Sequence, residues 1–216
     1  RNSGGYTQTS TLAYGLSWSQ NIATASLLEE LGGPSEMIEM AQKFDFDTTD
    51  WKEEMGLALG QAEVTPLDMS RLVSTVIREG RLASGSPVVL ARDIRGKILL
   101  DGPPEGAQVL TPEAAALTRD LMGLVISLGT GGSTRGRAGR VGFEGPAIGK
   151  TGTTDSEKDL WFVGGTAKYS AGLWLGYDQP ERIGAGASDL AAPLWGWWAK
   201  AVHEHFEHEA FPGMEL

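Results

Sequence analysis

Residues 149–154, with the sequence Gly-Lys-Thr-Gly-Thr-Thr, have the clearest chemical potential in this chain. Lys150 supplies a fixed positive charge, and the hydroxyl groups of Thr151 and Thr153 can donate hydrogen bonds. Gly152 has no side chain, so a ligand can lie against the backbone there. This combination suits a ligand that carries a carboxylate or a phosphate group.

Taken alone, the segment is typical of a polar β-turn, and it also matches the end of a phosphate-binding P-loop, G-x-x-x-x-G-K-[ST]. The first glycine of that motif would fall at Glu144, whereas the nearest glycine is Gly145. A helix should follow a P-loop, but residues 159–165 have the pattern of a strand. A nucleotide-binding protein is therefore a remote alternative.

A second polar pair, Ser19 and Asn21, lies upstream at the start of a predicted helix. The order S-x-N followed by K-T-G is found in penicillin-binding proteins and the related β-lactamases. S-x-N alone is a weak signal, because a serine or asparagine at that point is commonly a helix N-cap. The pair therefore carries more weight than either motif.

The composition limits the classes of protein that this chain can belong to. Its 216 residues are enough for one sizeable domain, and 41% hydrophobic with 21% charged residues indicates a folded, globular chain. The net charge of -10 repels nucleic-acid phosphates, so we expect no nucleic-acid partner. Because there is no cysteine, disulfides, cysteine-based zinc sites and cysteine nucleophiles are excluded.

Helices dominate the first part of the predicted structure. Apolar residues at helical spacing predict helices over residues 22–31 and from Pro34 onward. Thr65 and Thr111 each precede a proline, which is typical of an N-cap followed by the first helical residue. We expect a hairpin over residues 87–100.

The second part of the chain has strand periodicity. Residues 160–166 and 169–177 are predicted to be neighbouring strands, and a final helix begins near residue 191. The residues on the apolar face of this helix, which we expect to pack on the sheet, are Trp195, Trp198, Val202 and Phe206. Helices segregated from antiparallel strands indicate an α+β fold.

We interpret residues 1–216 as part of one domain, since no cap, strand or core pattern opens the chain. Its expected parts are a loop (1–20), a mainly helical part (21–128), a loop rich in glycine and arginine (129–146), and strands with a covering helix (147–216).

Several stretches resemble the transpeptidase domain of penicillin-binding proteins, most of all the bifunctional kind that also carries a glycosyltransferase domain. The stretches are residues 16–23 around S-x-N, 57–67 ending in V-T-P-L, 149–164 around K-T-G, 173–178 and 191–195. The resemblance implies an antiparallel sheet covered by helices with an adjoining helical subdomain, incomplete at its N-terminal side.

The resemblance also implies the reaction. Members of the family transfer acyl groups on peptidoglycan stem peptides that end in D-Ala-D-Ala, and β-lactam antibiotics imitate that dipeptide. No cofactor and no metal is implied. The implied location is the extracytoplasmic face of the bacterial cytoplasmic membrane, with anchoring only through a part outside this chain.

By the same resemblance, each motif residue has an implied role. Lys150 sets the positive field, the hydroxyls of Thr151 and Thr153 hold the carboxylate, and the Thr153 N–H is one of two oxyanion donors. Ser19 passes a proton to the leaving amine, and Asn21 holds the amide of the substrate. The remaining implied substrate-binding positions are Gly152 and Thr154.

One family motif, the S-x-x-K that carries the nucleophile, does not occur. No serine of the chain has a lysine three residues later, and the nearest match, Thr49 with Lys52, falls after S-x-N. We expect the nucleophile on an upstream segment that joins this chain. The alternative is a non-catalytic module that binds carboxylates or peptides at the K-T-G strand.

Two weaker clusters have ordinary explanations. His205 and His208 could share a metal, but a solvated helix end is more typical, and no metal site is predicted. The arginines of the glycine-rich loop could guide an anionic substrate, although a solvated loop is the better default; they are Arg135, Arg137 and Arg140.

Overall fold

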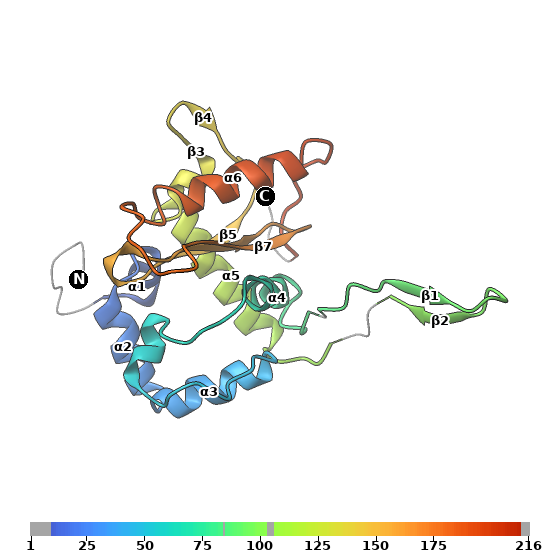
Figure 1. Cartoon of the computed structure of the whole chain (residues 1–216), viewed down its shortest axis with the longest axis horizontal. Helices are drawn as coiled ribbons and strands as arrows, with labels where there is room; N and C mark the ends of the chain where they lie inside the picture. Colours follow the sequence, from blue (N-terminus) through green and yellow to red (C-terminus); the bar gives the residue numbers. More distant parts are fainter. Residues whose placement is uncertain (1–9, 84, 103–105, 213–216) are drawn as a thin grey trace.

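A three-stranded antiparallel sheet is the centre of the part of the chain that the structure describes (Figure 1). The structure is a computed structural model and describes residues 10–83, 85–102 and 106–212. The helices are α1 (Leu12–Ser17), α2 (Asn21–Glu30), α3 (Pro34–Lys43), α4 (Pro66–Ile77), α5 (Pro112–Ser127) and α6 (Ala191–Val202), with short 3-10 helices η1 (Met55–Leu59), η2 (Gly132–Arg135) and η3 (Asp155–Glu157). The strands of the sheet are β5 (Ile148–Thr153), β6 (Leu160–Gly165) and β7 (Ser170–Leu175).

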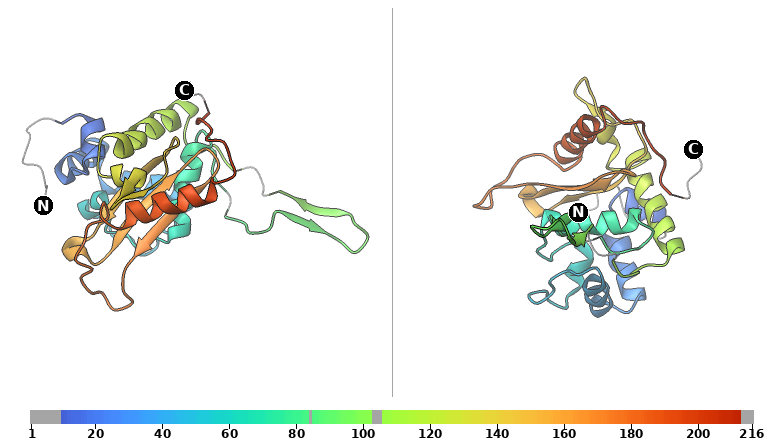
Figure 2. Two further views of the ribbon diagram at one scale, coloured as in Figure 1. Left: turned by 90° about the horizontal axis from the view of Figure 1, so that it is seen from above. Right: turned by 90° about the vertical axis from the view of Figure 1, so that its right-hand side faces the viewer.

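Helices cover both faces of this sheet. Helix α6 packs against one face, and α4 and α5 pack against the other, as the right-hand view in Figure 2 shows. The strand order is β5-β6-β7, with Lys150 opposite Val163. Because β6 lies in the middle and is covered on both faces, its residues are buried along almost the whole strand. The predicted α+β fold and the predicted neighbouring strands are confirmed.

The covering helix α6 is anchored by its tryptophans. Trp195 is 1% exposed and its ring centroid lies 5.1 Å from that of Phe162 on β6. Trp198 is partly buried against the same cluster. The prediction for Phe206 is wrong, because α6 ends at Val202 and Phe206 is 47% exposed beyond it.

The end of α6 is fixed by a buried histidine. The His203 ring lies 2.8 Å through Nδ1 from the Ala199 carbonyl oxygen and 3.1 Å through Nε2 from the Thr166 hydroxyl. Because these contacts hold the side chain at the C-cap, the chain leaves the helix there, and the apolar stripe does not continue to Phe206.

Local capping sets the starts of the two helices under the sheet. The Thr65 hydroxyl accepts from the Asp68 N–H at the start of α4, and the Thr111 hydroxyl accepts from the Ala114 N–H at the start of α5. Both N-caps were expected from the sequence, and both are confirmed.

The first twenty residues contain a helix that was not expected. The predicted loop is wrong at α1, where the Thr11 hydroxyl caps the helix by accepting from the Tyr14 N–H. Residues 1–9 of the predicted loop lie outside the described residues. Helix α2 follows and begins at Asn21, directly after the S-x-N serine.

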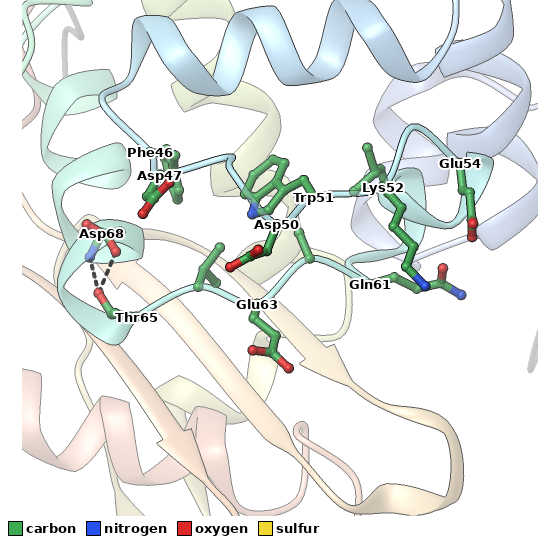
Figure 3. Close-up of a pocket in the computed structure, with 13 residues that line it drawn as sticks. Phe46, Asp47, Asp50, Trp51, Lys52, Glu54, Gln61, Glu63, Thr65 and Asp68 are labelled. Atoms are coloured by element: carbon green, nitrogen blue, oxygen red, sulfur yellow. Dashed lines mark hydrogen bonds between the residues drawn. The ribbon is translucent and has the colours of Figure 1, made fainter.

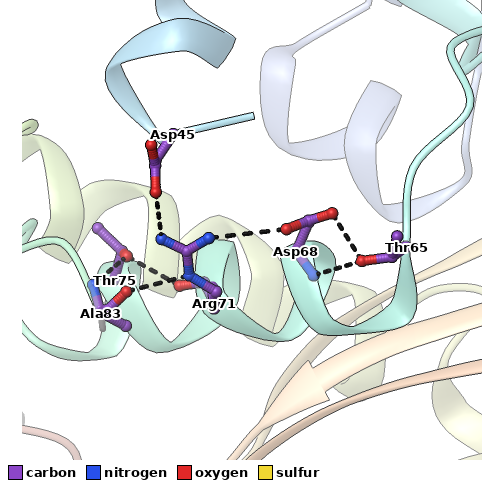
Figure 4. Close-up of polar contacts among 6 residues, drawn as sticks. All are labelled: Asp45, Thr65, Asp68, Arg71, Thr75 and Ala83. Atoms are coloured by element: carbon purple, nitrogen blue, oxygen red, sulfur yellow. Dashed lines mark hydrogen bonds and ion pairs between the residues drawn. The ribbon is translucent and has the colours of Figure 1, made fainter. Parts of the chain in front are cut away.

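Arg71 on α4 connects this helix to two neighbouring segments of the chain (Figure 4). The Arg71 guanidinium donates to Asp45 at 2.8 Å and lies 3.7 Å from Asp68. Its Nε donates to the carbonyl oxygen of Ala83, 3.2 Å away. One side chain thus ties the segment after α3 and the segment after α4 to the helix that supports the sheet.

The expected hairpin projects from the body as β1 (Leu90–Arg92) and β2 (Ile98–Asp101), seen at the right of Figure 1. Its turn is closed by Asp93, whose carboxylate accepts from the Arg95 and Lys97 N–H groups. Gly96 has φ +81°, which glycine adopts without strain.

The glycine- and arginine-rich loop is more ordered than expected. It contains η2 and a short hairpin of β3 (Gly136–Arg137) and β4 (Arg140–Val141). Arg135 donates to the Glu144 carbonyl oxygen, Arg137 pairs with Asp189, and Arg140 lies over the Trp197 ring. All three arginines are exposed, as expected of a solvated segment, and their contacts also hold the segment against its neighbours.

Over residues 10–83, 85–102 and 106–212, no helix combines the length and the apolar character that crossing a membrane requires.

Candidate active site

Ser19 lies in the short connection between α1 and α2. Its φ is +52°, a left-handed conformation that costs a non-glycine residue about 1–2 kcal/mol. The connection is held from both sides, since the Ser19 N–H donates to the Leu16 carbonyl and the Gln20 N–H donates to the Gly15 carbonyl. Strained residues of this kind concentrate at functional sites, where the surrounding structure fixes them.

Lys150 reaches Ser19 from the edge strand β5. Its Nζ donates to the Ser19 Oγ at 2.8 Å and to the Thr151 carbonyl oxygen at 2.7 Å. The two residues are 131 positions apart in the chain, so only the tertiary fold brings them together. The structure therefore places S-x-N and K-T-G at one site, as the sequence indicated.

The environment of Lys150 lowers the pKa of its ammonium group. Burial removes water from the ammonium group and lowers the pKa of Lys150 to about 8. With that pKa, protonated Lys150 outnumbers the neutral amine by about ten to one at pH 7. The group is thus a cation at neutral pH that can release a proton at small cost.

The threonines of K-T-G-T lie on one side of β5, because alternate residues of a strand face the same way. Thr151 is 8% exposed, and its Oγ1 lies 2.6 Å from the Oγ1 of Thr130. Thr153 is exposed at the end of the strand and accepts from the Ala187 N–H at 3.1 Å. These two hydroxyls lie on the same strand as Lys150, and hydroxyl and ammonium donors are groups suited to a carboxylate.

The other residues named from the sequence have less direct positions. Gly152 pairs with Trp161 across the sheet, and a Cβ atom there would lie 3.3 Å from the Trp161 Cβ. The Thr154 hydroxyl donates to the Asp159 carboxylate and accepts from the Asp159 N–H, so it closes the turn after β5. Asn21 is the first residue of α2 and is exposed.

Sequence reasoning missed Thr130, which follows α5 and contacts Thr151. Its only sequence signal is its place in Gly129-Thr130-Gly131, where glycines are typical of the end of a helix. The hydrogen bond joins residues 21 positions apart and has no local pattern.

A cavity of about 950 Å³ lies elsewhere, between the segment after α3 and the segment before α4 (Figure 3). No residue of S-x-N or of K-T-G lines this cavity. Its wall carries the carboxylates of Asp47, Asp50, Glu54, Glu63 and Asp68, with Lys52 as the opposing charge. An acidic wall repels a carboxylate ligand, so this cavity does not compete with the K-T-G strand for one.

The remaining alternatives from the sequence receive no support from the structure. A strand, β6, follows K-T-G where a P-loop would require a helix, which overturns the nucleotide-binding alternative. His205 and His208 are exposed, and no cluster able to hold a metal ion is found among the residues that the structure describes.

Comparison with known proteins gives a consistent family. The model of the penicillin binding protein transpeptidase domain matches residues 1–179. Penicillin-binding protein 1A of Aquifex aeolicus is 31% identical over 203 residues, which are 93% of this chain and 27% of that protein. Penicillin-binding protein 1A of Clostridium acetobutylicum is 32% identical over 196 residues, 89% of this chain and 23% of that protein.

Solved structures share the fold. Penicillin-binding protein 1A from Haemophilus influenzae has a TM-score of 0.77 at 22% identity, over 95% of this chain and 35% of that one. PonA1 from Mycobacterium tuberculosis, in complex with penicillin V, has a TM-score of 0.79 at 24% identity, over 97% of this chain and 60% of that one. The chain spans about a quarter of the length of the curated relatives.

Proposed function

The chain belongs to the penicillin-binding protein transpeptidase domain family, and on that premise we propose that it is the carboxylate-binding and proton-transferring part of a D,D-transpeptidase. The substrates of the whole protein are peptidoglycan stem peptides ending in D-Ala-D-Ala, and β-lactams are their mimics. The nucleophilic serine belongs to a segment outside this chain.

The hydrogen bond between Lys150 and Ser19 carries this proposal. It unites the two motifs at 2.8 Å, within the range over which a side chain can transfer a proton. A partly buried lysine beside a serine with left-handed backbone is the kind of costly arrangement that concentrates at functional sites.

The charge state of Lys150 supports the carboxylate role. A mainly protonated lysine at neutral pH attracts the terminal carboxylate, and the Thr151 and Thr153 hydroxyls donate to its oxygens. Such charge-assisted hydrogen bonds are stronger than neutral ones, so they fix the end of the ligand relative to the reacting carbonyl.

The proposed reaction is acyl transfer. The external serine oxygen bonds to the penultimate carbonyl carbon, the Thr153 N–H stabilises the oxyanion, and the C–N bond to the last D-Ala breaks. Ser19 gives its proton to the leaving amine and regains one from Lys150, to which it is hydrogen bonded, and Lys150 is reprotonated by the proton that the external serine loses as it attacks. An amine of a second stem peptide then takes the acyl group.

The location and the ligands of the whole protein follow from the same proposal. Peptidoglycan is cross-linked outside the cytoplasmic membrane, so the chain works on the extracytoplasmic face. The PonA1 complex with penicillin V supports β-lactam binding by this fold.

A second candidate is a non-catalytic module that binds carboxylates at β5. The observation that favours it is the absence of S-x-x-K from the 216 residues. The two candidates differ in one outcome, since only the enzyme forms a covalent adduct with penicillin.

The test is labelling of the whole protein with a fluorescent penicillin. Lys150→Ala removes the charged donor, so we expect the second-order labelling rate to fall by about 10–100-fold. Lys158→Ala is the matched control, because Lys158 is an exposed lysine in the connection between β5 and β6. No adduct in the mass spectrum of the unmodified protein, together with reversible binding of an acyl-D-Ala-D-Ala peptide, would instead establish the binding module.

A further inference from the structure

The connection after α5 touches both halves of the site. Thr130 in this connection donates its backbone N–H to the Ser17 carbonyl oxygen at 3.0 Å. Its side-chain Oγ1 lies 2.6 Å from the Oγ1 of Thr151 on β5. One residue therefore joins the segment that leads into Ser19 to the strand that carries Lys150.

The close approach at this point depends on a glycine. A Cβ atom at Gly129 would lie 2.1 Å from the Ser17 carbonyl oxygen, a distance at which a real side chain cannot fit. Only glycine therefore lets the connection reach α1. The next residues are also held, since the Gly131 N–H donates to the Val125 carbonyl at 2.9 Å. Thr130 thus sits in a rigid connection and not in a loose loop.

The hydroxyl pair has a simple proton balance. Each threonine hydroxyl has one proton to donate and two lone pairs to accept with, and two hydroxyls 2.6 Å apart share a single proton between them. If Thr151 donates to Thr130, the single hydroxyl proton of Thr151 is used, and Thr151 cannot donate to a carboxylate. If Thr130 donates to Thr151, the Thr151 proton remains available for the ligand.

We propose that Thr130 is a positioning residue of the transpeptidase site: its hydroxyl donates to Thr151, which directs the Thr151 proton at the carboxylate of the ligand. Its backbone at the same time holds the segment that leads into Ser19 close to β5. This inference rests on the proposed function, because it assigns Thr130 a part in recognising the carboxylate.

The experiment compares two ligands and three variants of the whole protein. The ligands are a fluorescent penicillin with a free carboxylate and its methyl ester, which lacks the charge. The variants are Thr130→Val, which removes the hydroxyl at nearly constant shape, Thr130→Ser, which keeps it, and the control Thr118→Val. Thr118 lies on α5, and its hydroxyl donates to the Ala114 carbonyl of its own helix.

We expect Thr130→Val to lower the labelling rate with the free acid by about 10-fold and to change the rate with the ester less than about twofold. Thr130→Ser restores the free-acid rate, and Thr118→Val leaves both rates unchanged. This acid-to-ester difference is a readout that a merely structural role would not move.

Two sets of results would overturn the inference while leaving the proposed function in place. They are equal loss with both ligands in Thr130→Val, and equal rates in Thr130→Val and Thr118→Val. Failure of the unmodified protein to label with either compound would overturn the proposed function itself, and the role of Thr130 with it.

Discussion

Lys150 combines two demands on a single side chain. Under the proposed function it must carry positive charge to attract a carboxylate, and it must exchange a proton with Ser19, to which it donates at 2.8 Å. Burial lowers its pKa to about 8, which satisfies both demands near neutral pH. A solvated lysine, with a pKa near 10.5, would hold its proton too firmly for the second task.

The lowered pKa predicts a pH dependence of stability. Between pH 8 and 10.5 the unfolded chain keeps a proton on Lys150 that the folded chain has released, so the free energy of unfolding rises with pH in that window. Below pH 8 both states are protonated and the cost of burying the charge is fully present. We expect wild type to gain about 2–3 kcal/mol between pH 7 and 10 relative to Lys150→Met.

Urea unfolding at a series of pH values measures this difference. The Lys150→Met variant cancels the titration of all other groups, because only residue 150 differs between the two proteins. A constant difference from pH 7 to 10 would show that the pKa of Lys150 is the same in the folded and unfolded states.

At this scale the sequence predicted that Lys150 and Ser19 lie together, but not which residues hold them in place. This contact was predictable because Lys150 and Ser19 each belong to a short motif of neighbouring residues, which can be recognised in the sequence. Thr130 belongs to no such motif, since its proposed role comes from a contact with Thr151 that only the folded chain creates. The left-handed backbone of Ser19 was equally invisible, because it results from the way α1 and α2 join.

Among the elements, the glycine at the end of α5 controls the distance between α5 and α1. Gly129 faces the Ser17 carbonyl, whereas Gly123 within α5 has no atom within 4 Å of the place where a Cβ would stand. A methyl group therefore fits at Gly123 but not at Gly129.

We expect Gly129→Ala to lower the free energy of unfolding by about 1–3 kcal/mol, because the new Cβ forces α1 away from α5. Gly123→Ala is the matched control and should raise it by up to about 1 kcal/mol, since alanine favours a helix. Urea midpoints of the two variants report these changes. Equal effects of both substitutions would contradict the tight contact at Gly129.

Elements with local signals were predicted well, and the others were not. The caps at Thr65 and Thr111 depend on residues three positions apart, so they could be read from the chain. Helix α1 has only six residues, too few for a periodic pattern. The stripe on α6 was extended to Phe206 because periodicity does not reveal that His203 ends the helix through a contact with Thr166.

On the scale of the whole molecule, the proposed function divides the site between this chain and a segment outside it. The structure contains the Lys150 ammonium and the Thr151 hydroxyl on β5, and the Ser19 hydroxyl that Lys150 contacts. Under the proposed function, the nucleophile and the second oxyanion donor come from the missing segment.

We therefore expect the isolated chain to form no adduct with a labelled penicillin, and the same chain within the whole protein to label readily. Without an activated nucleophile, only the residual acceleration from binding and the oxyanion hole remains, and half of that hole is absent. A gel and a mass spectrum decide the outcome. A stable adduct on Ser19 of the isolated chain would overturn the role of Ser19 as a proton carrier.

The position of β5 at the edge of the described sheet has one further consequence. The backbone N–H and C=O groups on its outer side are not used by β6, and an extended peptide can add to such an edge as an extra strand. Those bonds involve only main-chain atoms, which every peptide possesses. Selectivity then rests on geometry: the spacing between one amide and one terminal carboxylate. A small rigid ring that reproduces that spacing meets the same requirement as a peptide, so the edge that recognises a substrate by its backbone is equally open to mimicry.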